Sequence, residues 1–207
     1  MKYKTIIFDI DGTIINSFLP YLNIMKKLLP QYQKAFSKSL LKKTFSMSTK
    51  QELQTLKIPQ VYQKKFIIDY ALVEQKTTKA APYPGIEETL KKLHRNNFKL
   101  GILTSRTRAE TNALFKNYSF MKLIEVTATA DDIPYQKPNP RPLIETINKM
   151  HSNKTKTLYI GDSPVDEKTA QRAKVSFGLA KWGSTSLKKF SFAKFIFNSP
   201  LEILKLL

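Results

Sequence analysis

The feature that most constrains the fold of this chain is a set of short apolar segments that each end in polar residues. A short apolar, β-branched segment that stops at a turn is typical of a buried strand. Three are clear: residues 3–8 end at Asp9-Ile10-Asp11-Gly12, residues 98–103 at Thr104-Ser105, and residues 158–160 at Gly161-Asp162. Weaker segments of the same kind are residues 123–127, 175–179 and 195–197.

Helical patterns fill the intervals between these predicted strands. Ile86, Leu90 and Leu93 recur at helical spacing and predict one helix, and residues 107–117 and 142–150 predict two more. Alternating strands and helices with short polar links are typical of a parallel sheet with crossover helices. The sequence therefore predicts an α/β fold with a Rossmann-like parallel sheet.

Residues 17–82 have a different character, because they contain no convincing strand. Their apolar residues recur at helical spacing in two stripes: Phe18, Leu22, Met25 and Leu29, and then Tyr62, Phe66, Tyr70 and Val73. The turn-forming segment 80–85 then leads back to the strands. We therefore predict an α/β core made of residues 1–16 and 83–207, with a helical domain of residues 17–82 inserted into it.

The charge balance predicts an anionic partner. The chain has 35 Lys and Arg against 16 Asp and Glu, a net charge of +19, and the inserted segment alone carries 12 Lys against three acidic residues. Arginine dominates the recognition of DNA bases, and only five of the 35 cations are Arg. The charge balance therefore indicates an anionic partner, which could be nucleic acid, acidic lipid headgroups or a small phosphorylated molecule, and the excess of Lys over Arg is weak evidence for nucleic acid.

Cysteine content and apolar run lengths exclude several classes of protein. The chain has no cysteine, which excludes disulfides, thiolate metal sites and a thiol nucleophile. No apolar run approaches the ~18 residues of a membrane-spanning helix, and no secretory signal is visible at the first residues. We expect a cytoplasmic monomer with no membrane partner.

Carboxylates follow two of the predicted strands and should meet in the fold. The carboxyl ends of parallel strands lie at one edge of a sheet, so Asp9 and Asp11 should approach Asp162 and Asp166. Such a cluster repels itself unless a divalent cation is present, and an all-oxygen ligand set favours Mg²⁺. A lysine close to the cluster would complete the electrostatic match to a phosphoryl group.

Four segments, in this order along the chain, resemble the four motifs of the haloacid dehalogenase superfamily. They are Asp9-Ile10-Asp11-Gly12-Thr13, Leu103-Thr104-Ser105, Lys137 within Gln136-Lys137-Pro138, and Gly161-Asp162-Ser163-Pro164-Val165-Asp166. The resemblance covers essentially the whole chain, and the helical insertion takes the place of the family's first type of cap. By pattern, the chain is most similar to the phosphoglycolate phosphatase-like and β-phosphoglucomutase-like proteins.

The resemblance implies a role for each motif residue. Asp9 would attack phosphorus and form an aspartyl-phosphate, and Asp11 would protonate the leaving oxygen and then activate water. Thr104, the Ser105 amide and Lys137 would bind the phosphoryl group. Asp9, the Asp11 backbone carbonyl, Asp162 and Asp166 would hold Mg²⁺, with Asp166 acting directly or through water. These roles imply a Mg²⁺-dependent phosphatase of a small phosphorylated metabolite.

Two other functions stay open, and so do simpler interpretations of single residues. A phosphomutase would share the aspartyl-phosphate step, and an idle anion- or nucleic-acid-binding protein could keep the fold without the chemistry. Thr104-Ser105 alone is typical of a helix cap. Arg106 and Arg108 could approach a phosphate, but we expect them to lie on a solvated helix face. We expect Trp182 to serve in packing.

Overall fold

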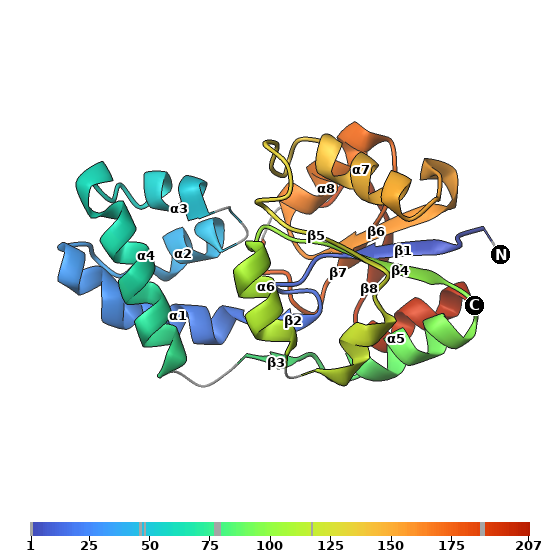
Figure 1. Cartoon of the computed structure of the whole chain (residues 1–207), viewed down its shortest axis with the longest axis horizontal. Coiled ribbons are helices and arrows are strands. Elements are labelled where there is room, and N and C mark those ends of the chain that lie inside the picture. Colours follow the sequence, from blue (N-terminus) through green and yellow to red (C-terminus); the bar gives the residue numbers. More distant parts are fainter. Residues whose placement is uncertain (1, 46, 48, 77–79, 117, 187–188) are drawn as a thin grey trace.

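The computed structural model describes residues 2–45, 47, 49–76, 80–116, 118–186 and 189–207. Its centre is a six-stranded parallel sheet in the order β5-β4-β1-β6-β7-β8, with β1 between β4 and β6 (Figure 1). The sheet confirms the predicted α/β fold, and each of its strands overlaps one of the predicted segments. The strands are β1 (Thr5–Phe8), β4 (Lys99–Leu103), β5 (Val126–Ala128), β6 (Thr157–Gly161), β7 (Ser176–Ala180) and β8 (Ala193–Phe197).

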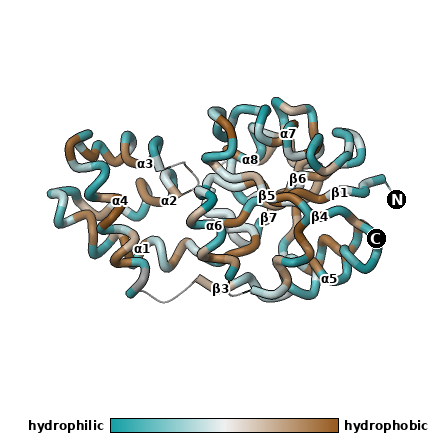
Figure 2. The backbone as a smooth tube through the Cα atoms, viewed as in Figure 1, coloured by the Kyte–Doolittle hydropathy of each residue, from teal (hydrophilic) through white to brown (hydrophobic). Residues whose placement is uncertain are grey.

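Helices cover both faces of this sheet. Helices α7 (Arg141–Lys149) and α8 (Pro164–Ala173) lie on one face, and α5 (Ile86–Arg95) lies on the other, beside the terminal 3₁₀ segment η4 (Pro200–Leu206) (Figure 1). Successive residues of a strand point to opposite faces. Ile6 and Phe8 therefore join the apolar cluster on the α5 side, whereas Ile7 joins the cluster on the α7 side. Figure 2 shows this apolar interior along the strands.

The helix α6 (Arg108–Phe115) begins later than the sequence indicates. Its cap is Thr107, whose hydroxyl accepts a hydrogen bond from the Glu110 amide while the Glu110 carboxylate accepts one from the Thr107 amide. Thr104 and Ser105 therefore do not cap this helix, and the cap interpretation of those two residues is wrong. Residue 117, the predicted end of the helix, lies outside the described residues.

The inserted segment is helical, as predicted. It contains α1 (Phe18–Leu28), the 3₁₀ segment η1 (Leu29–Tyr32), α2 (Lys38–Thr44), α3 (Thr49–Thr55) and α4 (Gln60–Gln75). These elements have an apolar core of their own, in which Leu22, Met25, Leu29 and Phe66 are buried as the two stripes predict, whereas Tyr62 is half exposed. They form a separate layer to the left of the sheet in Figure 1. The domain boundaries at residues 17 and 82 remain our prediction.

A short antiparallel strand pair joins the two parts of the chain. β2 (Ile15–Asn16) pairs with β3 (Ala81–Pro82), so the segments that leave and re-enter the core lie side by side (Figure 1). The sequence did not indicate β3, because two residues are too short to leave a periodic pattern. No helix in the described part of the chain is long and apolar enough to span a membrane.

Candidate active site

The sheet brings three motif segments to one edge. β1 lies between β4 and β6 in parallel register, so Asp9, Thr104 and Asp162 each follow the carboxyl end of one of three adjacent strands. The Asp9 amide extends the ladder by donating to the carbonyl of Ile160 at 2.9 Å, and the Thr104 amide donates to Ala128 at 3.0 Å. These bonds fix the backbone at the point where the polar side chains begin.

Three carboxylates meet at this edge of the sheet. Asp9, Asp162 and Asp166 each offer an oxygen, and these oxygens lie within 4.8 Å of one another. All three residues are buried. Burial raises the pKa of Asp9 to about 7, with Asp166 and Asp11 adding to the effect against Lys137. Burial, followed by the charges of Asp166 and Asp9, also raises the pKa of Asp162 well above its usual value. The three carboxylates therefore repel one another, and the positive charge beside them only partly compensates this repulsion.

Lys137 supplies the one ammonium group that contacts this cluster among the described residues. Its Nζ lies 2.9 Å from Asp9 Oδ1 and 2.7 Å from Asp166 Oδ1, and its side chain is 4% exposed. Burial alone would lower the pKa of Lys137, but the charges of Asp166 and Asp9 raise it well above its usual value. The lysine therefore stays charged between the two carboxylates.

The carboxylates of Asp166 and Asp162 differ in the hydrogen bonds that they accept. Asp166 Oδ1 accepts hydrogen bonds from Lys137 and from the Tyr159 hydroxyl at 2.7 Å, and its Oδ2 accepts from the amide and hydroxyl of Ser163. The side chain of Asp162, by contrast, receives a long hydrogen bond of 3.4 Å from Thr13. Asp162 therefore has oxygen lone pairs free for a cation, whereas Asp166 already has protein donors on both oxygens.

The loop after Asp9 depends on a glycine. Gly12 has a φ of +76°, a conformation that residues with a side chain rarely adopt. A Cβ atom at this position would also overlap the carboxylate of Asp162. Trp182 supports the same loop, because its Nε1 donates to the Thr13 carbonyl at 3.0 Å in addition to its packing against Tyr83. The packing prediction for Trp182 thus captured only part of its role.

Asp11 is held apart from the three clustered carboxylates. Its Oδ1 accepts hydrogen bonds from the Ser17 hydroxyl at 2.5 Å and from Arg106 Nη2 at 2.7 Å, and its Oδ2 accepts from Arg106 Nε at 2.7 Å. Burial alone would raise the pKa of Asp11, but Arg106 and then Ser17 bring it below its usual value. Asp11 is therefore an ionised carboxylate in a two-pronged ion pair.

The expectation that Arg106 lies on a solvated helix face is wrong. Arg106 precedes α6, and its side chain is only 20% exposed because it reaches across to Asp11. Arg108 does lie at the rim, where it is 41% exposed and pairs with Asp132. The sequence could not distinguish the two arginines, since both follow the same strand and their partners are distant along the chain.

The remaining motif residues line a small hollow beside the carboxylates. Thr104, Ser105 and Lys137 share it with Gln136 and Tyr135. Thr104 is buried, and its Oγ1 accepts a hydrogen bond from the Arg106 amide at 3.1 Å. Every predicted site residue thus lies at this edge of the sheet, with Asp11 turned toward Arg106.

Tyr159 is a site residue that the sequence analysis missed. It lies within β6, is fully buried, and donates to Asp166, while Lys137 approaches its hydroxyl at 3.3 Å. A buried tyrosine hydroxyl needs a hydrogen-bond partner, so a tyrosine within a predicted buried strand was the signal from which a polar partner could have been inferred. The sequence did not indicate that the partner would be a motif carboxylate.

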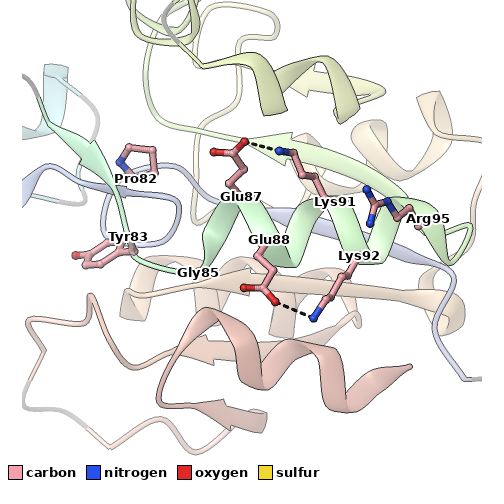
Figure 3. A pocket seen from close by; sticks show the side chains of 8 residues that line it. All are labelled: Pro82, Tyr83, Gly85, Glu87, Glu88, Lys91, Lys92 and Arg95. Carbon is pink, nitrogen blue, oxygen red and sulfur yellow. Dashed lines mark hydrogen bonds and ion pairs between the residues drawn. The ribbon is translucent and has the colours of Figure 1, made fainter.

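A larger pocket of about 560 Å³ lies elsewhere, along α5 (Figure 3). Its lining includes Glu87 and Glu88, which form ion pairs with Lys91 and Lys92 on the next helical turn. None of the clustered carboxylates lines this pocket. Four of its five charged lining residues pair with one another, and Arg95 is the fifth; we assign this pocket no chemistry (Figure 3).

Comparison with known proteins places the chain among hydrolases. Residues 6–180 match the model of the haloacid dehalogenase-like hydrolases. Pyrophosphatase PpaX of Halalkalibacterium halodurans is 29% identical over 175 residues, which cover 80% of this chain and 78% of the relative. Phosphoglycolate phosphatase of Aquifex aeolicus is 23% identical over an alignment that covers 99% of this chain and 96% of the relative. A crystal structure from Lactobacillus plantarum, provisionally assigned as a phosphoglycolate phosphatase, has a TM-score of 0.90 and 37% identity, with full coverage of both chains.

Proposed function

The chain belongs to the haloacid dehalogenase-like hydrolases, and we propose that it is a Mg²⁺-dependent phosphatase of a small phosphorylated metabolite. The observation that carries this proposal is the buried arrangement of Asp9, Asp162 and Asp166 around the ammonium group of Lys137. With a divalent cation held by the carboxylates, this combination could neutralise a phosphoryl group, and it places the Asp9 carboxylate beside that group. The relatives named above as a pyrophosphatase and a phosphoglycolate phosphatase support a small phosphorylated substrate.

We assign the nucleophilic role to Asp9. Its carboxylate stands at the end of the central strand, and attack on phosphorus would form an aspartyl-phosphate while the P–O bond to the leaving group breaks. Lys137 stays charged beside it and offsets the repulsion between two anions. Thr104 and the Ser105 amide would bind the phosphoryl oxygens from the adjacent strand end.

We assign proton transfer to Asp11. It follows Asp9 by two residues, and its carboxylate would deliver a proton to the leaving oxygen and later take one from water. In the structure this carboxylate is ionised and paired with Arg106, so the role requires the side chain to leave Arg106, take up a proton from solvent and turn toward the leaving oxygen.

The residues present fit a magnesium ion. The carboxylates form a hard, all-oxygen donor set in which burial and mutual repulsion raise the pKa of Asp9 and Asp162, and a divalent cation would relieve that repulsion. We propose that Asp9, Asp162 and the Asp11 backbone carbonyl hold the ion. Asp166 would contribute through its charge and through water, because its own oxygens are bonded to protein donors. When bound, Mg²⁺ supplies charge neutralisation to the transferring phosphoryl group.

A panel of phosphate esters, tested with Mg²⁺ and with a chelator, examines this proposal directly. We expect release of inorganic phosphate that depends on Mg²⁺. Asp9→Asn should reduce turnover by at least about 10³-fold, because the amide cannot act as the nucleophile. Asp131→Asn is the matched control, since Asp131 lies on the exposed loop beside Arg108 and outside the cluster.

Two results would contradict these assignments. Undiminished turnover by Asp9→Asn would remove the nucleophile assignment. Isomerisation of a sugar phosphate without release of inorganic phosphate would identify a phosphomutase instead.

A further inference from the structure

Arg106 belongs to the same rigid loop as the residues assigned to the phosphoryl group. Its amide donates to Thr104 Oγ1 at 3.1 Å, and its carbonyl accepts from the Ala130 amide at 2.8 Å. The backbone of Arg106 is therefore fixed two residues from Thr104. Only its side chain is free to change partner.

The guanidinium of Arg106 lies on the more exposed side of the site. Both side chains of the Arg106–Asp11 pair are 20% exposed, whereas Lys137, Asp9 and Asp166 are 4%, 6% and 0% exposed. The pair can thus be reached by a ligand, while the lysine cluster behind it is closed.

Residues of the inserted helical segment approach Arg106 from the other side. Tyr70 and Glu74 of α4 interact electrostatically with both Arg106 and Asp11. Arg106 therefore lies at the boundary between the sheet domain and the insertion. A substrate enclosed between these two parts would place its non-reacting portion near this guanidinium.

The proposed role of Asp11 creates a charge problem for Arg106. When Asp11 turns toward the leaving oxygen, it must release at least part of its two-pronged contact with Arg106. A partly buried guanidinium without a partner carries a large desolvation penalty. A substrate anion that presents two oxygens matches the two donors of that guanidinium and removes the penalty.

We propose that Arg106 binds a second anionic group of the substrate, a carboxylate or a second phosphoryl group next to the scissile phosphate, in exchange for Asp11. This inference rests on the proposed phosphatase function and names its substrate class: phosphate esters or anhydrides whose leaving group is itself anionic. The carboxylate and the second phosphoryl group present the same paired oxygens, so the chemistry of recognition is shared.

The experiment compares substrates that differ in that one charge. Phosphoglycolate and pyrophosphate carry the second anion, and 2-hydroxyethyl phosphate and p-nitrophenyl phosphate do not. Wild-type kcat/KM should favour the anionic pair by at least about 10-fold, and Arg106→Gln should reduce this preference by about 10- to 100-fold, the range for one charged two-pronged contact. Comparing phosphoglycolate with pyrophosphate tells which anion is bound.

Three further variants separate recognition from structural damage. Arg106→Lys keeps the charge but not the paired donors, so its preference should be intermediate. Arg108→Gln changes the arginine at the start of α6, which pairs with Asp132, and should leave the preference unchanged. Glu74→Gln removes a competing carboxylate near Arg106 and should increase the preference for anionic substrates.

A binding measurement keeps the test independent of turnover. In the Asp9→Asn background, calorimetric titration should show that Arg106→Gln weakens phosphoglycolate binding by about 10- to 100-fold and weakens 2-hydroxyethyl phosphate binding much less.

The inference is overturned if wild type hydrolyses p-nitrophenyl phosphate but shows no anion preference, or if Arg106→Gln leaves the preference and the binding ratio intact. Glu74 would then be the group that compensates Arg106. If no phosphate ester is hydrolysed with Mg²⁺ present, the proposed function fails as well, and the inference fails with it.

Discussion

Replacing Lys137 with methionine tests the charge balance on which the candidate site depends. The variant keeps the length and packing of the side chain but leaves Asp9 and Asp166 without the ammonium group that lies 2.9 and 2.7 Å from them. Removing one partner of a buried ion pair destabilises a protein by about 3–5 kcal/mol. Since a typical domain is stable by only about 5–15 kcal/mol, the loss is a large fraction of the total.

Urea unfolding at about pH 8 in the presence of a chelator measures this loss. With a slope of about 2 kcal/mol per molar urea, a loss of 4 kcal/mol lowers the midpoint by about 2 M. Excess Mg²⁺ should restore part of the difference by binding the folded form. Lys168→Met is the matched control, because Lys168 is an exposed lysine on α8 and its loss should change stability by less than about 0.5 kcal/mol.

The pH dependence of the Lys137→Met deficit has a definite sign. Even with the lysine present, burial raises the pKa of Asp9 from 3.8 to about 7. A carboxyl group whose pKa is higher in the folded state than in the unfolded state contributes fully to folding stability at a pH below its unfolded pKa. The protein loses that contribution as the pH rises through the pKa of the folded state. The deficit should therefore be largest above about pH 7 and shrink toward about pH 4. A loss below about 1 kcal/mol, or one that does not vary with pH, would refute the reasoning.

Three other substitutions test neighbouring features. Asp162→Ala should weaken Mg²⁺ binding in a calorimetric titration, and an unchanged affinity would contradict its role as a ligand. Glu52→Gln should stabilise the protein by up to about 3 kcal/mol at about pH 8 and not at pH 4.5. The reason is that burial raises the pKa of Glu52 from 4.5 to about 7, against the hydrogen bond from Tyr21. If wild type and variant have equal urea midpoints at both pH values, this reasoning is wrong. Gly12→Ala should lose more than about 1 kcal/mol, since φ is +76° and the new Cβ would overlap Asp162; wild-type stability would show that the loop relaxes freely.

The arrangement of elements was largely predictable because its signals are local. A short, β-branched apolar segment that ends in a turn, such as residues 3–8, favours a buried strand, and the stripe Leu22, Met25 and Leu29 favours one buried face of a helix. Parallel order then places the strand ends at one edge, so Asp9 and Asp162 were expected to meet. The pair β2–β3 escaped prediction because a two-residue strand has no period, and the helix predicted to begin at residue 107 begins at Arg108 because Thr107 caps it.

Within the candidate site, the sequence by itself determined which residues could be present, and the tertiary structure decided what each one contacts. The resemblance to the family's motifs identified Asp11, Lys137 and Asp166, but only the folded chain pairs Asp11 with Arg106 and surrounds Asp166 with Tyr159, Lys137 and Ser163. The physical reason is that periodicity reports how each segment buries its own surface, whereas hydrogen bonds and ion pairs between distant segments depend on distances and burial that form only when the chain has folded.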